Sequence, residues 1–157
     1  MTAKPSYRVL IIEARFYEDL ADELIRGAIT ALEDAGAEFE RIAVPGALEI
    51  PTAMALACDA GLMPFGANRW RFHGCIALGT VIRGQTTHYE TVANESTRWL
   101  MQIATRRHVP VGNGILTVEN SAQAWERARG GRKSKGGDAA RACLALIDVM
   151  SNFHGWT

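Results

Sequence analysis

The sequence lacks the features of a membrane protein, a nucleic-acid-binding protein or a secreted protein. Its 17 Lys and Arg residues are balanced by 17 Asp and Glu residues, so no overall field favours a polyanion or an anionic membrane surface. No apolar run approaches the roughly 20 residues that span a bilayer, and the N-terminal MTAKPS has no signal-peptide core. We therefore expect a cytoplasmic protein with no nucleic-acid or membrane partner.

Cysteine is also scarce. Cys58, Cys75 and Cys143 form no C-x-x-C pair, and they stand among apolar neighbours. An odd number of separated cysteines fits neither a disulfide framework nor a metal site. We predict three buried, reduced thiols and no metal.

Repeats, linkers and low-complexity tracts are absent as well, so residues 1–157 are expected to form a single domain. Apolar runs predict strands at 7–14 and 38–44, a third ending near Gly79, and a fourth at 111–118. Between and after them, helices are predicted at 18–36, at 52–60, from Thr87, from Ser121 and at 138–153. This alternation predicts an α/β fold, a three-layer α/β/α sandwich with a four-stranded parallel sheet in flavodoxin-like order.

The most informative stretch is LGTVIRGQTTHYETVANES, residues 78–96. Thr87 and Glu90 have the spacing of a capping box, which predicts a helix beginning at His88. A helix N-terminus preceded by Arg83 suits a phosphate, and the helix dipole favours a neutral His88 that can accept a proton. A plain capped turn with a surface histidine explains the same residues.

A second unusual stretch is PGALEIP, residues 45–51. Two prolines around a glycine predict a rigid loop, with Pro51 in the first turn of the next helix. The stretch could be a simple strand-to-helix connection. Glu49 at its tip favours a binding role, because open α/β sheets bind ligands beyond the carboxyl ends of their strands.

Three further segments leave alternatives open. The aromatic-rich loop at 61–73 fits a lid, a subunit contact or local packing. Glycines beside Asn113, at 112 and 114, fit the close approach of a ligand or another chain, or a bulge. The cations of 127–137 fit a solvated basic loop, or an anion site at Arg127 and Lys135.

Taken together, the ordered motifs resemble the 6,7-dimethyl-8-ribityllumazine synthase family. The resemblance rests on Arg15-Phe16, VPGALEIP at 44–51, LGTVIRG at 78–84 with TTH at 86–88, GILT at 114–117 and Lys135-Gly136. It covers nearly the whole chain, and the number of motifs in order makes it specific.

The resemblance implies an enzyme of riboflavin biosynthesis. Members of the family condense 5-amino-6-(D-ribitylamino)uracil with 3,4-dihydroxy-2-butanone 4-phosphate, without metal or cofactor. An imine forms, phosphate is eliminated, and ring closure with loss of water gives the lumazine. This chemistry requires proton transfer and a phosphate site.

The resemblance also assigns roles to individual residues. His88 would transfer the proton. The ribitylaminouracil would contact Phe16, Ala47, Leu48, Glu49, Thr80, Val81, Ile82 and Asn113. Phosphate would be bound by Gln85, Thr86 and Arg127, with Lys135 near the site.

The family further implies a homopentamer, with Asn113, Arg127 and Lys135 entering the site from a neighbouring subunit, and a possible higher assembly. Asn113 stands where many members have a Phe, and Pro5 and the long 61–73 loop favour an isolated pentamer. The Asn113 departure also motivates an alternative, a non-catalytic protein that binds lumazine or riboflavin. An unrelated flavodoxin-like phosphate-binding module would leave the 45–51 loop without a role.

Overall fold

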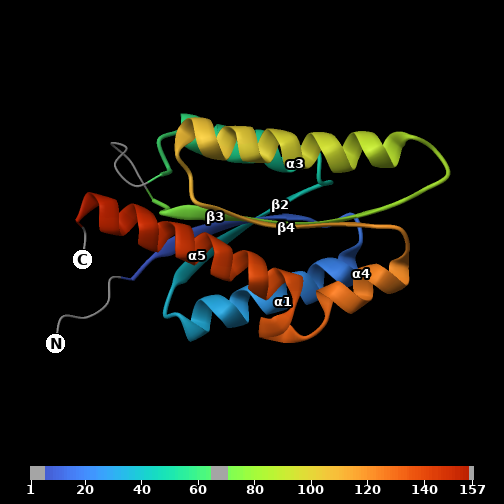
Figure 1. Ribbon diagram of the computed structural model, residues 1–157, viewed down its shortest axis with the longest axis horizontal. Coiled ribbons are helices and arrows are strands. Elements are labelled where there is room, and N and C mark those ends of the chain that lie inside the picture. The colour runs from blue at the N-terminus through green and yellow to red at the C-terminus, as the bar shows by residue number, and fades with distance from the viewer. Residues whose placement is uncertain (1–5, 65–70, 156–157) are drawn as a thin grey trace.

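The computed structural model describes residues 6–64 and 71–155 of the chain (Figure 1). Along the chain the elements are β1 (Arg8–Ala14), α1 (Glu18–Asp34), β2 (Glu38–Val44), α2 (Glu49–Asp59), β3 (Gly74–Ile82), α3 (His88–Arg107), β4 (Val111–Val118), α4 (Ser121–Ala128), a short 3-10 turn (Gly131–Lys133) and α5 (Lys135–His154). The four strands pair in parallel in the order β2-β1-β3-β4. The predicted α/β fold with a flavodoxin-like parallel sheet is confirmed.

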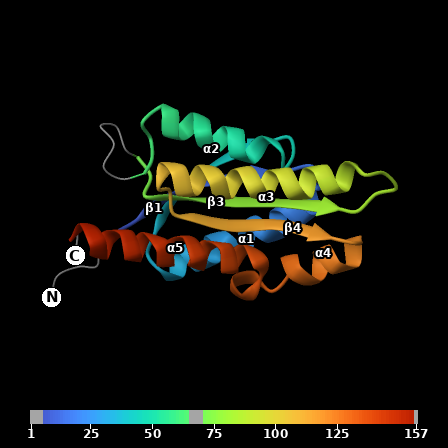
Figure 2. The ribbon, with the colours of Figure 1, turned by 45° about the horizontal axis from the view of Figure 1, so that its top comes forward.

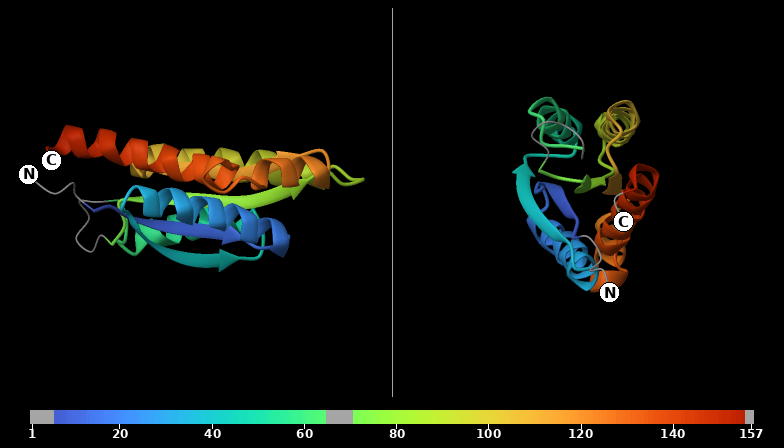
Figure 3. Two further views of the ribbon diagram at one scale, coloured as in Figure 1. Left: turned by 90° about the horizontal axis from the view of Figure 1, so that it is seen from below. Right: turned by 90° about the vertical axis from the view of Figure 1, so that its left-hand side faces the viewer.

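Helices cover both faces of the sheet, so the molecule has three layers (Figures 2 and 3). Helices α2 and α3 pack on one face, against alternate residues such as Leu10, Ile12 and Ala77. Helices α1, α4 and α5 pack on the other face, against Val9, Ile11 and Leu78. Strands β1, β3 and β4 thus bury side chains on both faces, which is why their sequences are largely apolar, while the outer strand β2 has no buried residue.

Strand β3 extends past the predicted end at Gly79 to Ile82. Gly79 stays in register with Ile115 of β4, and a Cβ added to it would lie 3.1 Å from the Cβ of Ala14. The glycine therefore brings β1 and β3 close together within the sheet. It does not end the strand.

The glycines of β4 face helix α5, not a ligand, and the strand has no bulge. The register between β3 and β4 is continuous from Val111 to Val118. A Cβ added to Gly112 would lie 1.8 Å from the carbonyl oxygen of Ala139, and one added to Gly114 would lie 2.6 Å from Leu78 Cδ2. The sequence interpretation of a ligand, a second chain or a bulge at these glycines is wrong, because α5 occupies the space.

Helix α5 begins earlier than predicted, and its buried face agrees only in part with the apolar face that the sequence predicts, which includes Ala139, Cys143, Leu146 and Phe153. The hydroxyl of Ser134 accepts a hydrogen bond from the Gly137 amide, which starts the helix at Lys135 instead of Asp138. Cys143 and Ile147 are buried as part of the inward face. Phe153, predicted on that face, is 86 % exposed. Further exposed apolar side chains are Leu146 and Val149 of α5, Trp99 and Met101 of α3, Leu56 of α2 and Ile42 of β2.

The three cysteines are buried and free, as predicted. Within the 61–73 loop, Met63 and Phe72 are also buried, which supports local packing for these two side chains. Phe65 and Trp70 of the same loop, and Pro5, lie outside the described residues. No helix in 6–64 and 71–155 is long and apolar enough to cross a bilayer.

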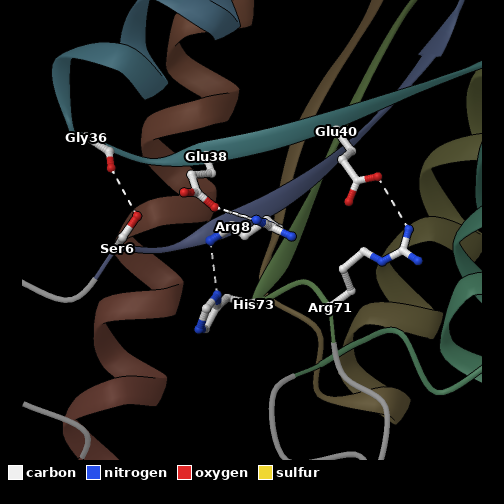
Figure 4. Close-up of polar contacts among 7 residues, drawn as sticks. All are labelled: Ser6, Arg8, Gly36, Glu38, Glu40, Arg71 and His73. Carbon is white, nitrogen blue, oxygen red and sulfur yellow. Dashed lines mark hydrogen bonds and ion pairs between the residues drawn. The ribbon is translucent and has the colours of Figure 1, made fainter.

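A histidine closes the amino-terminal end of the sheet (Figure 4). The backbone amide of Arg8 donates to His73 Nδ1 at 3.0 Å, while the His73 amide donates to the Arg8 carbonyl at 2.7 Å. The imidazole is buried and lies 5.4 Å from the Tyr7 ring. Burial lowers the pKa of His73 below its ordinary value of 6.5.

Gly112→Ala is expected to destabilise the protein by about 3 kcal/mol. The added methyl group would overlap the backbone of α5, which cannot shift as a flexible side chain can. Chemical denaturation of both proteins measures the difference. Gly84→Ala is the control, because a Cβ there meets nothing within 4 Å, and an equal loss in the two variants would contradict the packing argument.

Unfolding should depend on pH through His73. Because burial depresses its pKa in the folded state, the unfolded chain binds more protons, and stability is lost as pH falls below about 6.5. In His73→Gln, a side-chain oxygen can accept the Arg8 amide without titrating, so this part of the pH dependence should disappear. Denaturant unfolding of both proteins between pH 8 and 5 compares them, and identical pH profiles would refute the role of His73.

Candidate active site

A mostly apolar pocket lies at the carboxyl edge of the sheet, where β1, β2 and β3 end. Its volume is about 440 Å³. The lining residues are Phe16, Tyr17, Pro45, Gly46, Ala47, Leu48, Glu49, Thr80, Val81, Ile82, Gly84, Thr86, His88, Tyr89 and Val92. Segments far apart in the sequence meet here, because parallel strands bring all their carboxyl ends to one edge.

Phe16 lies in the turn between β1 and α1 and is 73 % exposed. Its ring meets the Tyr17 ring edge-on, with 4.9 Å between centroids. An exposed aromatic face at the mouth of a pocket suits a flat heterocycle. The structure places Phe16 at this pocket, and its contact with a substrate ring stays a prediction.

The 45–48 loop lines the pocket together with Phe16. Helix α2 begins at Glu49, three residues before the predicted start at Thr52, because Leu48 is already helical (φ −62°, ψ −27°) and the Glu49 amide donates to the Gly46 carbonyl. Glu49 is thus in the first turn of the helix, not at a loop tip. Its side chain lines the pocket, and Pro51 lies in the first turn as predicted.

The end of β3 forms the floor of the pocket with Thr80, Val81 and Ile82. The Thr80 hydroxyl oxygen is buried and has no hydrogen-bond partner among the described residues. Buried polar atoms are normally paired. Because this oxygen is not accessible from the open pocket, Thr80 lines the pocket through its other atoms.

The N-terminus of helix α3 is capped differently from the prediction. The capping box of Thr87 and Glu90 does not form, since Thr87 has helical dihedral angles and its side chain makes no cap hydrogen bond. Instead, the His88 amide donates to the Thr86 hydroxyl at 3.3 Å. Helix α3 still begins at His88, whose side chain lines the pocket.

Arg83 holds this loop in place. Its guanidinium donates to Glu90 at 2.5 Å and to Glu119 at 2.6 Å, and it lies 4.4 Å from the centroid of the Tyr89 ring. The Arg83 guanidinium lowers the pKa of Glu90. Because two carboxylates already pair with Arg83, its charge is committed to positioning the loop. The sequence interpretation that Arg83 contributes to a phosphate site is not supported.

Arg127 and Lys135 do not reach this pocket in the same chain. They line a second, cationic cavity of about 440 Å³ beside β4, together with Arg129 and Lys133. Asn113 also lies outside the first pocket, and its side-chain oxygen accepts from the Ile115 amide at 3.0 Å. The structure thus divides the predicted site residues into two groups.

Gln85 lies in the loop that is predicted to bind phosphate. Its side chain is exposed and does not line the pocket. Sequence reasoning missed Tyr17 and Tyr89, which do line it. Both are direct neighbours of predicted site residues, so adjacency was the available signal. Among the described residues, no group of three or more His, Cys, Asp and Glu side chains could hold a metal ion.

The fold and this pocket define a flavodoxin-like α/β protein with a small-molecule site at the carboxyl edge of its sheet. The sequence pattern of the 6,7-dimethyl-8-ribityllumazine synthase family matches residues 6–151. The chain belongs to this family.

Individual relatives carry the same name. The 6,7-dimethyl-8-ribityllumazine synthase of Agrobacterium fabrum is 52 % identical over 94 % of this chain and 97 % of its own length. The enzyme of the same name from Bartonella tribocorum is 50 % identical over 98 % of this chain and 95 % of its own length. The enzyme of the same name from Azorhizobium caulinodans is 55 % identical over 89 % of this chain and 84 % of its own length.

Arg83→Gln is expected to loosen the loop that carries Thr86 and His88. Amide hydrogen exchange of residues 83–88 should become faster, while the melting temperature changes little, because exposed ion pairs contribute little to stability. Mass spectrometry of the exchanged peptides measures the effect. The control is Arg98→Gln, which removes a similar arginine from a carboxylate (3.7 Å) and a Trp99 ring (5.5 Å) farther along α3. Unchanged exchange in Arg83→Gln would refute the positioning role.

Proposed function

We propose that this chain condenses 5-amino-6-(D-ribitylamino)uracil with 3,4-dihydroxy-2-butanone 4-phosphate to 6,7-dimethyl-8-ribityllumazine, and that residues 1–157 form one domain for this task. The observation that carries the proposal is the gathering of Phe16, Glu49, Thr80 and His88 around one pocket. They come from four separate segments. We place the reaction in the cytoplasm, where buried free thiols persist.

The pocket lining suits the uracil substrate. Phe16 offers an aromatic face to the pyrimidine, and Val81 and Ile82 offer apolar surface beneath it. Glu49 and the backbone at Ala47 and Leu48 face the same space, and they bind the hydroxyls of the ribityl chain.

The loop before α3 suits the phosphate. The amides of Gln85 and Thr86 lie at the N-terminus of a 20-residue helix, where unpaired N–H groups and the helix dipole favour an anion. His88 is the first residue of that helix and lines the pocket beside the loop. It transfers the proton as the amine attacks the ketone and as phosphate leaves.

Arg127, Lys135 and Asn113 complete the site from a neighbouring subunit of a homopentamer. In support, Arg127 and Lys135 line a separate cavity in their own chain, so a single chain holds only part of the proposed site. Exposed Trp99 and Phe153 provide apolar surface for subunit contacts. No feature of residues 6–64 and 71–155 favours the non-catalytic alternative.

Two substitutions test these roles. His88→Ala should lower kcat by roughly 10²-fold, the usual effect of losing a general acid–base group. Arg127→Ala should raise KM for the phosphate substrate about tenfold, through loss of a charge-assisted hydrogen bond. Formation of the lumazine chromophore from both substrates measures each rate. Activity that is unchanged in both variants would refute the assigned roles, and an inactive wild-type assembly would refute the proposed function.

A further inference from the structure

A buried carboxylate that does not line the pocket lies one residue before the end of β1, the strand that leads to Phe16. Glu13, on the central strand β1, has a side chain that is only 3 % exposed. It accepts hydrogen bonds from Arg15 Nη1 at 2.6 Å and from Arg41 Nε and Nη2 at 2.7 and 3.2 Å. Arg15 also bonds Asp22 of α1 at 2.5 Å. One carboxylate thus joins β1, β2, the turn after β1 and, through Arg15, helix α1.

This arrangement is not explained by stability. Removing a carboxylate from water costs free energy that its ion pairs often only balance, and apolar replacements in protein cores are frequently neutral or stabilising. The apolar residues Val9 and Ile11 occupy the equivalent positions earlier on the same face of β1. The charge at Glu13 therefore points to a role in positioning.

The turn that Glu13 holds is the one that carries Phe16. Phe16 is mostly exposed, so burial in the core does not fix its place. Arg15, the residue before it, is held by both its backbone and its side chain. The Arg15 amide donates to the Val44 carbonyl at 3.2 Å, and the Arg15 guanidinium is held between Glu13 and Asp22. The position of Arg15 therefore sets the direction in which the next side chain, Phe16, points.

We propose that Glu13 is a positioning residue for substrate binding, which acts through Arg15 to set the Phe16 ring against the pyrimidine. Arg41 holds the same carboxylate from β2, four residues before Pro45. This inference rests on the proposed function, because it assumes that Phe16 contacts the uracil substrate.

The test is a double-mutant cycle on the assembled enzyme. Phe16→Ala should raise KM for the ribitylaminouracil about tenfold, and Glu13→Gln about threefold, with kcat and KM for the phosphate substrate changed much less. In the Phe16→Ala background, Glu13→Gln should have no further effect on that KM, because contacts in one chain of interactions are not additive. Arg41→Gln, which removes the half-exposed partner, should reproduce the effect and serves if Glu13→Gln folds poorly.

The control is Glu38→Gln. Glu38 and Arg8 form a carboxylate–arginine pair at 2.7 Å between the same two strands at the opposite end of the sheet (Figure 4). Its substitution should leave every kinetic constant unchanged. Equal effects of Glu38→Gln and Glu13→Gln, or additive effects of Glu13→Gln and Phe16→Ala, would overturn the inference and leave the proposed function standing. Absence of any effect in Phe16→Ala would overturn both the ring contact and the inference.

Discussion

The parallel pairing of β1 with both β2 and β3 is the constraint on which the pocket depends. It fixes the order of the strands and directs their carboxyl ends to one edge, so the turns after β1 and β2 and the loop after β3 meet there (Figure 1). Gly79 tightens this pairing, because the absence of its side chain lets β3 approach Ala14 at the end of β1. The chemistry of the site is set by loops, and their arrangement is set by the sheet.

Much of this architecture could be predicted from sequence, because buried parallel strands and amphipathic helices leave strong apolar patterns. Strands β2 and β4 have the predicted bounds, and most predicted pocket residues line one cavity. Helix α5 could be oriented only in part, because the single apolar face that the sequence predicts holds Cys143, which is buried, together with Leu146 and Phe153, which are exposed. Tertiary contact sets the orientation of the helix: Ala139 packs against Gly112 of β4, and this contact turns Cys143 and Ile147 into the core.

Charged side chains were the other limit of prediction. Arg83 is close to Thr86 and His88 in sequence, which suggested a phosphate ligand, but its partner Glu119 lies at the end of a different strand. Glu13 and Arg41 are likewise joined only across the sheet. The local sequence reveals that a charge is present. Its partner depends on strand order and register, which set the distances between charges.

The side chain of Asn113 has a consequence for how the protein avoids unwanted association. Strand β4 is an outer strand, and an open strand edge invites another chain to add to the sheet. By accepting the Ile115 amide, Asn113 occupies one of the backbone donors that such a strand would need. This one side chain thereby makes that position of the edge less able to pair with another strand.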